Sequence, residues 1–169
     1  AGVLAVAAGA DVLLLDPATA TVRATLRGHT GALRRLVFSP DGARLASAGA
    51  DREVRIWDAR GGAAAAAQVL GPTDDPLHSI AFSPDGREVA AGTRSGAVVV
   101  WSLDETHPVM RLGVGRDPAL VAFSRDGKRL LGTAGGGALT VWRTIDFRRD
   151  APILEVTELG AGASEVRDF

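Results

Sequence analysis

The stretch FSPDG at Phe38–Gly42 decides the fold, because the chain repeats it twice more. FSPDG returns at Phe82–Gly86, and the variant FSRDG stands at Phe123–Gly127. Each copy is followed by an apolar run that ends in a tryptophan, and these are Trp57, Trp101 and Trp142. Successive copies are 44 and 41 residues apart, for the phenylalanines and for the tryptophans alike. A period of this length predicts one supersecondary unit stacked against its neighbours.

One repeat, from Leu26 to Leu70, contains four segments of strand character. They are Ala32–Phe38, Arg44–Ala48, Glu53–Trp57 and Ala64–Leu70. Turn sequences separate the first three, since proline presets φ, aspartate binds its own backbone and glycine accepts positive φ. The fourth is weaker, because its alanine run Ala63–Ala67 is also compatible with a helix. Four short antiparallel strands per repeat predict an all-β propeller, in which neighbouring sheets cover each other's faces.

This repeat resembles a WD repeat. The matching segments are Leu26–Gly31, Phe38–Gly42, Leu45–Ser47, Asp51 and Ile56–Asp58, in the order and spacing of that family. With partial repeats included, the resemblance spans nearly the whole chain, and it implies a β-propeller of four-stranded antiparallel blades. In WD repeats a histidine, a serine or threonine, an aspartate and a tryptophan form a hydrogen-bonded chain inside the blade. The corresponding residues here are His29, Ser47, Asp51 and Trp57.

The two later repeats keep only the tryptophan of these four positions. At the other positions stand Pro72–Thr73, Ala91 and Ser95 in the second repeat, and Gly113–Val114, Gly132 and Gly136 in the third. A buried indole still gains from burial of its ring. We therefore expect these blades to be held by apolar packing and to be less rigid than the first.

Residues 1–169 are predicted to form one propeller region of about four blades. The blades are expected at residues 1–26 together with 165–169, at 27–70, at 71–112 and at 113–158. The first would lack its own first strand, which Val166–Phe169 resembles. Because the chain starts at Ala1 and stops in an apparent strand, we expect an excerpt of a larger ring of seven or eight blades. A homodimer that completes an eight-bladed ring and a self-closed four-bladed ring stay open as alternatives.

Composition excludes several classes of partner. The net charge is −1, so the chain as a whole should not attract nucleic acid or an anionic membrane. No apolar run reaches the roughly 18 residues of a membrane span. The chain has no cysteine, which agrees with a cytoplasmic location. Arginine greatly outnumbers lysine and tyrosine is absent, a bias that suggests a GC-rich bacterial source.

The sequence shows no constellation of catalytic or metal-binding residues. The three histidines, His29, His78 and His107, do not have metal-ligand spacing. The serines before the turns occupy one repeat position and are therefore structural; they are Ser39, Ser83 and Ser124. The acidic pair Asp74–Asp75 lacks the alternating carboxylates of a calcium loop. We predict no catalytic residue, no metal, no cofactor and no enzymatic activity.

Function is therefore expected to lie in binding. Loops that enter the first strands, and turns between the second and third, should meet on one face of a propeller. By repeat alignment, the residues on that face to test first are Arg34, His78, Arg94 and Asp117. We predict a scaffold for protein–protein interaction, the docking or sensor region of a larger bacterial signalling protein, with a protein or another domain of the same longer chain as partner. The alternative is a ligand-binding or enzymatic propeller that uses the central channel.

Overall fold

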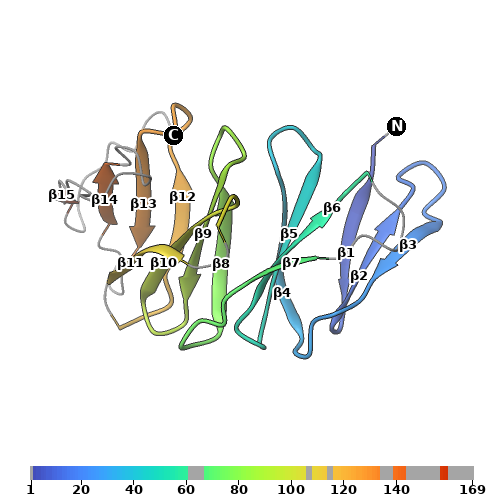
Figure 1. The fold of residues 1–169 in the computed structure, drawn as a ribbon, viewed down its shortest axis with the longest axis horizontal. Helices are drawn as coiled ribbons and strands as arrows, with labels where there is room; N and C mark the ends of the chain where they lie inside the picture. The colour runs from blue at the N-terminus through green and yellow to red at the C-terminus, as the bar shows by residue number, and fades with distance from the viewer. Residues whose placement is uncertain are drawn as a thin grey trace.

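The computed structural model describes residues 2–60, 67–105, 108–113, 116–133, 139–143 and 157–159. In these ranges the chain is all-β: its strands form four antiparallel sheets, and none of it is helical (Figure 1). The described part of the chain therefore contains no helix with the length and hydropathy needed to cross a membrane. The all-β architecture expected from the repeat is confirmed.

Each sheet is a simple up-and-down meander. The first contains β1 (Leu4–Ala8), β2 (Asp11–Leu15) and β3 (Val22–Leu26). The second contains β4 (Leu33–Phe38), β5 (Arg44–Gly49), β6 (Val54–Asp58) and β7 (Gln68–Leu70). The third contains β8 (Leu77–Phe82), β9 (Glu88–Thr93), β10 (Ala97–Ser102) and β11 (Pro108–Gly113). The fourth contains β12 (Leu120–Phe123), β13 (Arg129–Thr133), β14 (Leu139–Arg143) and β15 (Thr157–Leu159).

The FSPDG turn is built the same way in three sheets. The hydroxyl of Ser39 donates to the Asp41 carboxylate at 2.6 Å, and its oxygen accepts the N–H of Arg44 at 2.9 Å. Asp41 also accepts the N–H of Ala43 at 3.0 Å, and Gly42 takes a positive φ of 66°. The equivalent serine and aspartate bond at 2.6 Å in the third sheet and 2.7 Å in the fourth. The serines that recur through the repeat thus hold the turns.

The sheets stand side by side in a row. The strands that begin them, β1, β4, β8 and β12, contact one another in chain order, as neighbouring blades of a propeller do. The first and fourth sheets lie at opposite ends of the row, far from one another (Figure 1). The described sheets are thus an open fan, which differs from the self-closed four-bladed alternative. Four sheets leave a gap instead of closing into a ring when the angle between adjacent sheets is smaller than a closed four-bladed ring requires.

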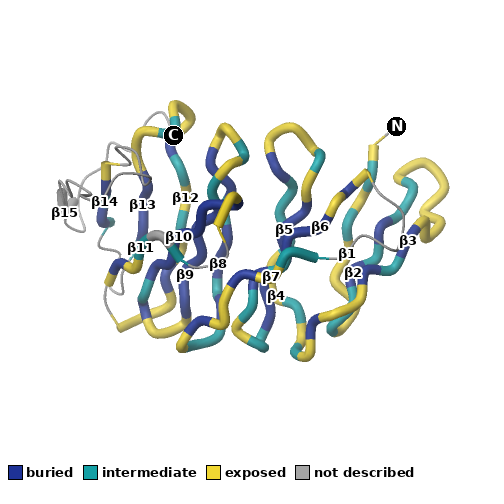
Figure 2. Tube along the Cα trace, in the orientation of Figure 1, coloured by how far each residue is buried: buried dark blue, intermediate teal, exposed yellow. Residues whose placement is uncertain are grey.

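Each tryptophan packs against the sheet before its own. Trp57 of the second sheet shares a cluster with Val12 and Leu14 of the first. Trp101 of the third shares one with Ile56 and Leu70 of the second. The buried residues of the third sheet follow the middle of its strands, while the turns are exposed (Figure 2). Burial of one indole removes on the order of 200 Å² of mostly apolar area from water, so these residues join adjacent sheets strongly.

Some predictions about segments fall only partly on described residues. The weak fourth segment of the first full repeat is a strand over Gln68–Leu70, whereas residues 61–66 lie outside the described residues. The segment 165–169, assigned to the first blade, also lies outside them, as do His107 and Gly136. The described part of the first sheet has three strands, and its partner from the end of the chain stays a prediction.

Candidate functional site

The four residues expected to form a hydrogen-bonded chain, here called the quartet, are brought together in the second sheet. They come from the loop before β4, from β5, from the β5–β6 turn and from β6, and they are His29, Ser47, Asp51 and Trp57. His29 Nδ1 lies 2.7 Å from Asp51 Oδ2, and His29 Nε2 lies 2.7 Å from Ser47 Oγ. Trp57 Nε1 donates to the same Ser47 Oγ at 2.8 Å.

The direction of these bonds follows from the chemistry of the end groups. An indole N–H can only donate, and an ionised carboxylate can only accept. Trp57 therefore donates to Ser47, the Ser47 hydroxyl donates to His29 Nε2, and the His29 Nδ1–H donates to Asp51. The Ser47 oxygen joins two side chains that cannot bond one another directly. A neutral imidazole satisfies the whole quartet.

Burial raises the importance of the Asp51–His29 bond. The side chain of His29 is fully buried and that of Asp51 is 4% exposed. Burial pushes the pKa of Asp51 upward, but the hydrogen bonds from His29 and from the Thr30 N–H outweigh it, so the pKa is lowered. The Thr30 N–H contributes through a 3.0 Å bond to Asp51 Oδ2. Asp51 thus ties the entry loop of the sheet to its second turn.

The backbone around the quartet leaves no space for another side chain. A Cβ on Gly49 would lie 2.7 Å from Asp51 Oδ1 and 3.1 Å from His29 Nδ1. A Cβ on Gly28 would meet the guanidinium of Arg55, which covers that glycine and would have to move. In the Gly-His pair of the repeat, the histidine therefore supplies the polar groups, and the glycine leaves room for neighbouring side chains because it has no side chain of its own.

Glu53 lies next to the quartet, and the sequence analysis did not single it out. Ligand atoms of His29, Asp51 and Glu53 lie within 4.8 Å of one another, which would suit a metal ion. Both nitrogens of His29 already carry hydrogen bonds, however, and Glu53 binds the Arg55 guanidinium at 2.8 Å. A metal would have to displace these bonds, so we interpret the cluster as structural. The signal that could have revealed it is an acidic residue two positions after Asp51.

The third sheet replaces the quartet with apolar and main-chain contacts. Ala91 occupies the position of Ser47, and Trp101 Nε1 is buried without a hydrogen-bond partner among the described residues. Thr73 stands where His29 would be and donates to the carbonyl oxygens of Arg52 at 3.1 Å and Asp75 at 2.8 Å. The hydroxyl thus links the third sheet to a turn of the second.

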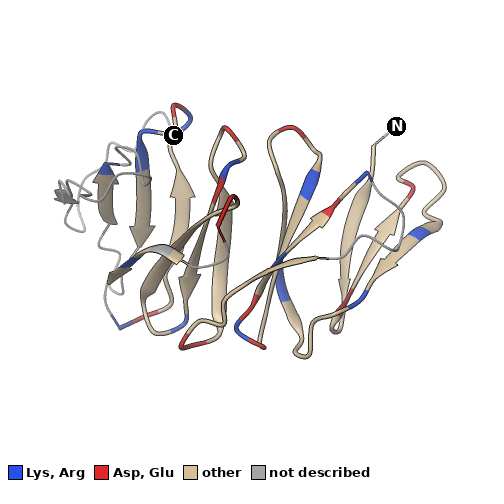
Figure 3. Ribbon diagram, viewed as in Figure 1, with Lys and Arg blue, Asp and Glu red and all other residues tan. Residues whose placement is uncertain are grey.

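The proposed partner residues lie at one end of the sheets. Arg34, Arg94 and Asp117 are exposed, and His78 is half-buried. The turn that carries Arg94 binds the segment before β8 through a 2.9 Å bond from the Arg94 N–H to the Pro76 carbonyl. Most charged residues lie in the turns and strand ends at the two ends of the sheets (Figure 3). No hydrogen bond or ion pair is seen to join these four side chains where the structure describes them.

The sequence matches a known family pattern at two positions. The pattern described as WD domain, G-beta repeat fits residues 20–58 and 67–102. WD40 repeats are thus found at these two positions. Each match runs from the last strand of one sheet through three strands of the next, so a WD40 repeat bridges two blades. This arrangement agrees with the packing of each tryptophan on the preceding sheet.

Three relatives show similar segments. Protein Mut11 of Chlamydomonas reinhardtii is 58% identical over 38 residues, 22% of this chain and 10% of its own length. WD repeat and SOCS box-containing protein 1 of Takifugu rubripes is 32% identical over 95 residues, 56% of this chain and 22% of its own. The 66 kDa stress protein of Physarum polycephalum is 31% identical over 93 residues, which are 54% of this chain and 15% of its own length. The chain thus aligns with less than a quarter of the length of each relative.

Proposed function

We propose that these WD40 blades are part of a larger propeller that holds other proteins without catalysing a reaction. WD40 repeats are in general protein-interaction scaffolds, and the similarity to WD-repeat relatives supports that role. The observation that carries the proposal is a row of antiparallel sheets on which Arg34, Arg94 and Asp117 are exposed at the same end. The finer proposal is a docking or sensor region of a cytoplasmic bacterial signalling protein, in which only the bacterial source has support, from the predominance of arginine over lysine.

The contact surface in this proposal is the docking edge, defined by Arg34, His78, Arg94 and Asp117. Three of these side chains are exposed, and the backbone under them is held by bonds between turns and strands of the sheets. When a partner binds an exposed arginine whose backbone is already held in place, the conformational entropy lost is mainly that of the arginine side chain. Arginine is also among the residues that contribute most at protein interfaces.

A crosslinking experiment tests the docking edge in the full-length parent protein. A photoreactive benzoylphenylalanine at position 94 should capture a partner that the same group at Arg125, on the other end of the sheets, does not. With that partner purified, Arg34→Glu and Arg94→Glu should each weaken binding by about tenfold, while Arg125→Glu should leave it unchanged. Equal capture from both positions, or binding insensitive to charge at Arg34 and Arg94, would overturn the proposal.

A ring-completing homodimer is the second candidate, and the incomplete first sheet favours it. Among the described residues β1 pairs only with β2, and its Leu4 and Val6 are 51% and 40% exposed. These residues need a cover, which either further blades of the same chain or a second copy would supply. Light scattering on the 169-residue chain separates the two, because a monomer has a mass of 17.4 kDa and a ring dimer twice that.

A further inference from the structure

Arg52, in the turn between β5 and β6, has a backbone conformation that suits glycine better than arginine. Its φ is 69°, in the left-handed region, where a side chain crowds the backbone and costs free energy. The N–H of Arg52 donates to the Gly49 carbonyl at 3.3 Å. In the turn between β9 and β10 the N–H of Gly96 donates to the Thr93 carbonyl at the same distance, so the two turns are equivalent. Gly96, with a φ of 89°, is thus the glycine that the second sheet replaces with arginine.

The fold itself does not require this arginine. Its side chain is exposed, so burial does not offset the cost of the left-handed backbone. A strained residue that packing does not need indicates a role for its side chain.

Main-chain hydrogen bonds place Arg52 beside the docking edge. The Arg52 carbonyl accepts the N–H of Thr73 at 2.9 Å, at the start of the loop that enters the third sheet. At the other end of this loop, the N–H of Arg94 donates to the Pro76 carbonyl, also at 2.9 Å. Residues 73–76 therefore join the turn that carries Arg52 to the turn that carries Arg94.

Two further arginines reach the same end of the sheets. The N–H of Ala119 donates to the carbonyl of the last residue of β9 at 3.0 Å, so the loop that carries Arg116 lies against the turn after β9. The N–H of Ala50 donates to the Ala32 carbonyl at 2.9 Å, two residues before Arg34. Four exposed arginines thus lie along this end, and they are called the arginine patch: Arg34, Arg52, Arg94 and Arg116.

The arginine patch carries a positive charge that its acidic neighbours do not neutralise. The ion pairs between the described residues include none of its four arginines. The acidic residues that are engaged at this end are Asp11 with Arg27, Asp51 with His29, Glu53 with Arg55, and Asp74 with Arg111. In the described part of the chain, that leaves the exposed Asp117 and the half-buried Asp75.

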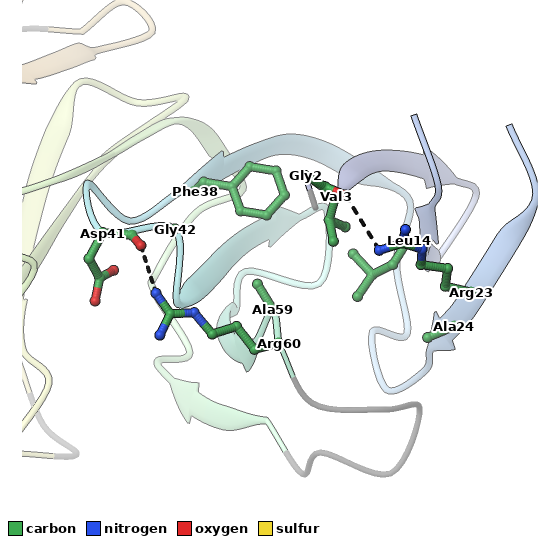
Figure 4. Close-up of a pocket in the computed structure, with 10 residues that line it drawn as sticks. All are labelled: Gly2, Val3, Leu14, Arg23, Ala24, Phe38, Asp41, Gly42, Ala59 and Arg60. Atoms are coloured by element: carbon green, nitrogen blue, oxygen red, sulfur yellow. Dashed lines mark hydrogen bonds between the residues drawn. The ribbon is translucent and has the colours of Figure 1, made fainter. Parts of the chain in front are cut away.

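At the opposite end of the sheets, the aspartate of each FSPDG-type turn interacts with the charge of a basic residue. The pairs are Arg60 with Asp41, Arg87 with Asp85, and Lys128 with Asp126. Arg60 also donates to the Asp41 main-chain carbonyl at 3.0 Å, beside a cleft of about 640 Å³ between the first and second sheets (Figure 4). Positive and negative charges are therefore matched within these turns, in contrast to the arginine patch.

We propose that the arginine patch binds an acidic segment of a partner protein, with a run of aspartate or glutamate side chains. The inference rests on the proposed function and names the chemistry of the partner at the docking edge. A guanidinium group binds a carboxylate through paired, charge-assisted hydrogen bonds, so arginines spread along the row of sheets match carboxylates spread along a chain. A basic segment is repelled by the same charges, which makes the patch selective.

The probe is a fluorescein-labelled peptide, acetyl-Glu-Asp-Glu-Asp-Glu-Asp-amide, and its uncharged match has glutamine and asparagine instead. In fluorescence anisotropy titrations of the protein at low salt, the acidic peptide should bind about tenfold more tightly than its match. Added salt should weaken that binding. A single-stranded oligonucleotide of the same charge should bind more weakly than the acidic peptide, because the described part of the patch has no aromatic side chain on which bases stack.

One variant separates binding from stability. Arg52→Gly removes the side chain and the backbone strain together, so it should weaken binding of the acidic peptide by about threefold while leaving the melting temperature equal or higher. Arg125→Gly is the matched control, because it removes one positive charge at the opposite end of the sheets. It should leave the binding unchanged.

Equal binding of the two peptides, oligonucleotide binding as tight as that of the acidic peptide, or full binding by Arg52→Gly would overturn the inference. A lower melting temperature of Arg52→Gly would do so too, since the arginine would then stabilise the fold. The proposed function fails separately, if the photoreactive group at position 94 captures no partner. Capture of a partner there, with equal binding of the two peptides, leaves the proposed function standing and removes only this inference.

Discussion

The second and third sheets both bury a tryptophan, but different contacts hold its indole in place. In the second, the indole of Trp57 is bound through Ser47 and His29 to Asp51. In the third, Trp101 is 1% exposed and its N–H has no partner where the chain is described. The strand that carries Trp101 is more apolar than β6, and its Val98–Val100 are almost completely buried. The comparison shows that apolar packing alone can hold the tryptophan, and that the quartet adds a link between turn and entry loop.

The most severe test of this comparison is Ser47→Ala, which gives the second sheet the residue found in the third. It leaves Trp57 Nε1 and His29 Nε2 buried without partners, whereas the third sheet has no equivalent histidine that would lose its hydrogen bond. We expect a loss of about 3 kcal/mol in the free energy of unfolding, measured by urea denaturation. A loss below about 0.5 kcal/mol would mean that the quartet does not stabilise the fold.

A smaller loss is expected for Asp51→Ala. This change removes the acceptor of both the His29 ring and the Thr30 N–H, and it should cost about 1–3 kcal/mol. The matched control is Ser95→Ala, at the equivalent turn of the third sheet, where the hydroxyl only contacts Thr93 Oγ1 at 3.2 Å. The control should cost less than about 0.5 kcal/mol. Equal shifts in melting temperature would contradict the assignment of Asp51 to the quartet.

The reverse change should stabilise the third sheet. Ala91→Ser places a hydroxyl where Ser47 lies in the second sheet and offers Trp101 Nε1 an acceptor. We expect a gain of about 1 kcal/mol in the free energy of unfolding. Ala90→Ser is the control, because Ala90 is buried in a different, apolar cluster between the third and fourth sheets. It should destabilise the protein, and a gain of the same size there would exclude the indole as the cause.

The smallest effect is a pH dependence confined to acid. The pKa of Asp51 is lowered in the folded protein, so its stabilisation is complete above about pH 4, the ordinary value for aspartate. The stabilisation is lost as pH falls through the lowered pKa. The stability difference between wild type and Asp51→Asn should therefore shrink below pH 4. The turn aspartates also titrate there, with lowered pKa values, but they are common to both proteins and cancel. A difference that grows toward low pH would refute this sign.

Features that depend on a few consecutive residues could be predicted well. The FSPDG turns and the strands beside them follow from proline, aspartate, glycine and the apolar run, which act over short distances. The observed β4, Leu33–Phe38, begins one residue after the predicted segment, and β6, Val54–Asp58, is likewise shifted by one. The alanine run Ala63–Ala67 is compatible with both a helix and a strand, and most of it lies outside the described residues. The part of this segment that pairs with β6 is Gln68–Leu70.

The candidate site was partly accessible from the sequence. Resemblance to WD repeats named the four members of the quartet, and the structure places them within hydrogen-bonding distance. Glu53 and the close approach of Gly49 were missed, because they depend on how the turn folds back on the entry loop.

The sequence by itself determined the repeat, its turns, its strands and the loss of polar partners in the later blades. All of these follow from local conformational preferences and from a pattern copied along the chain. Only the tertiary structure decided that the sheets form an open row, that the Trp101 N–H is buried without a partner, and that a cleft separates the first two sheets. Those outcomes depend on how side chains from segments distant in the sequence pack together. Local conformational preferences do not determine that packing.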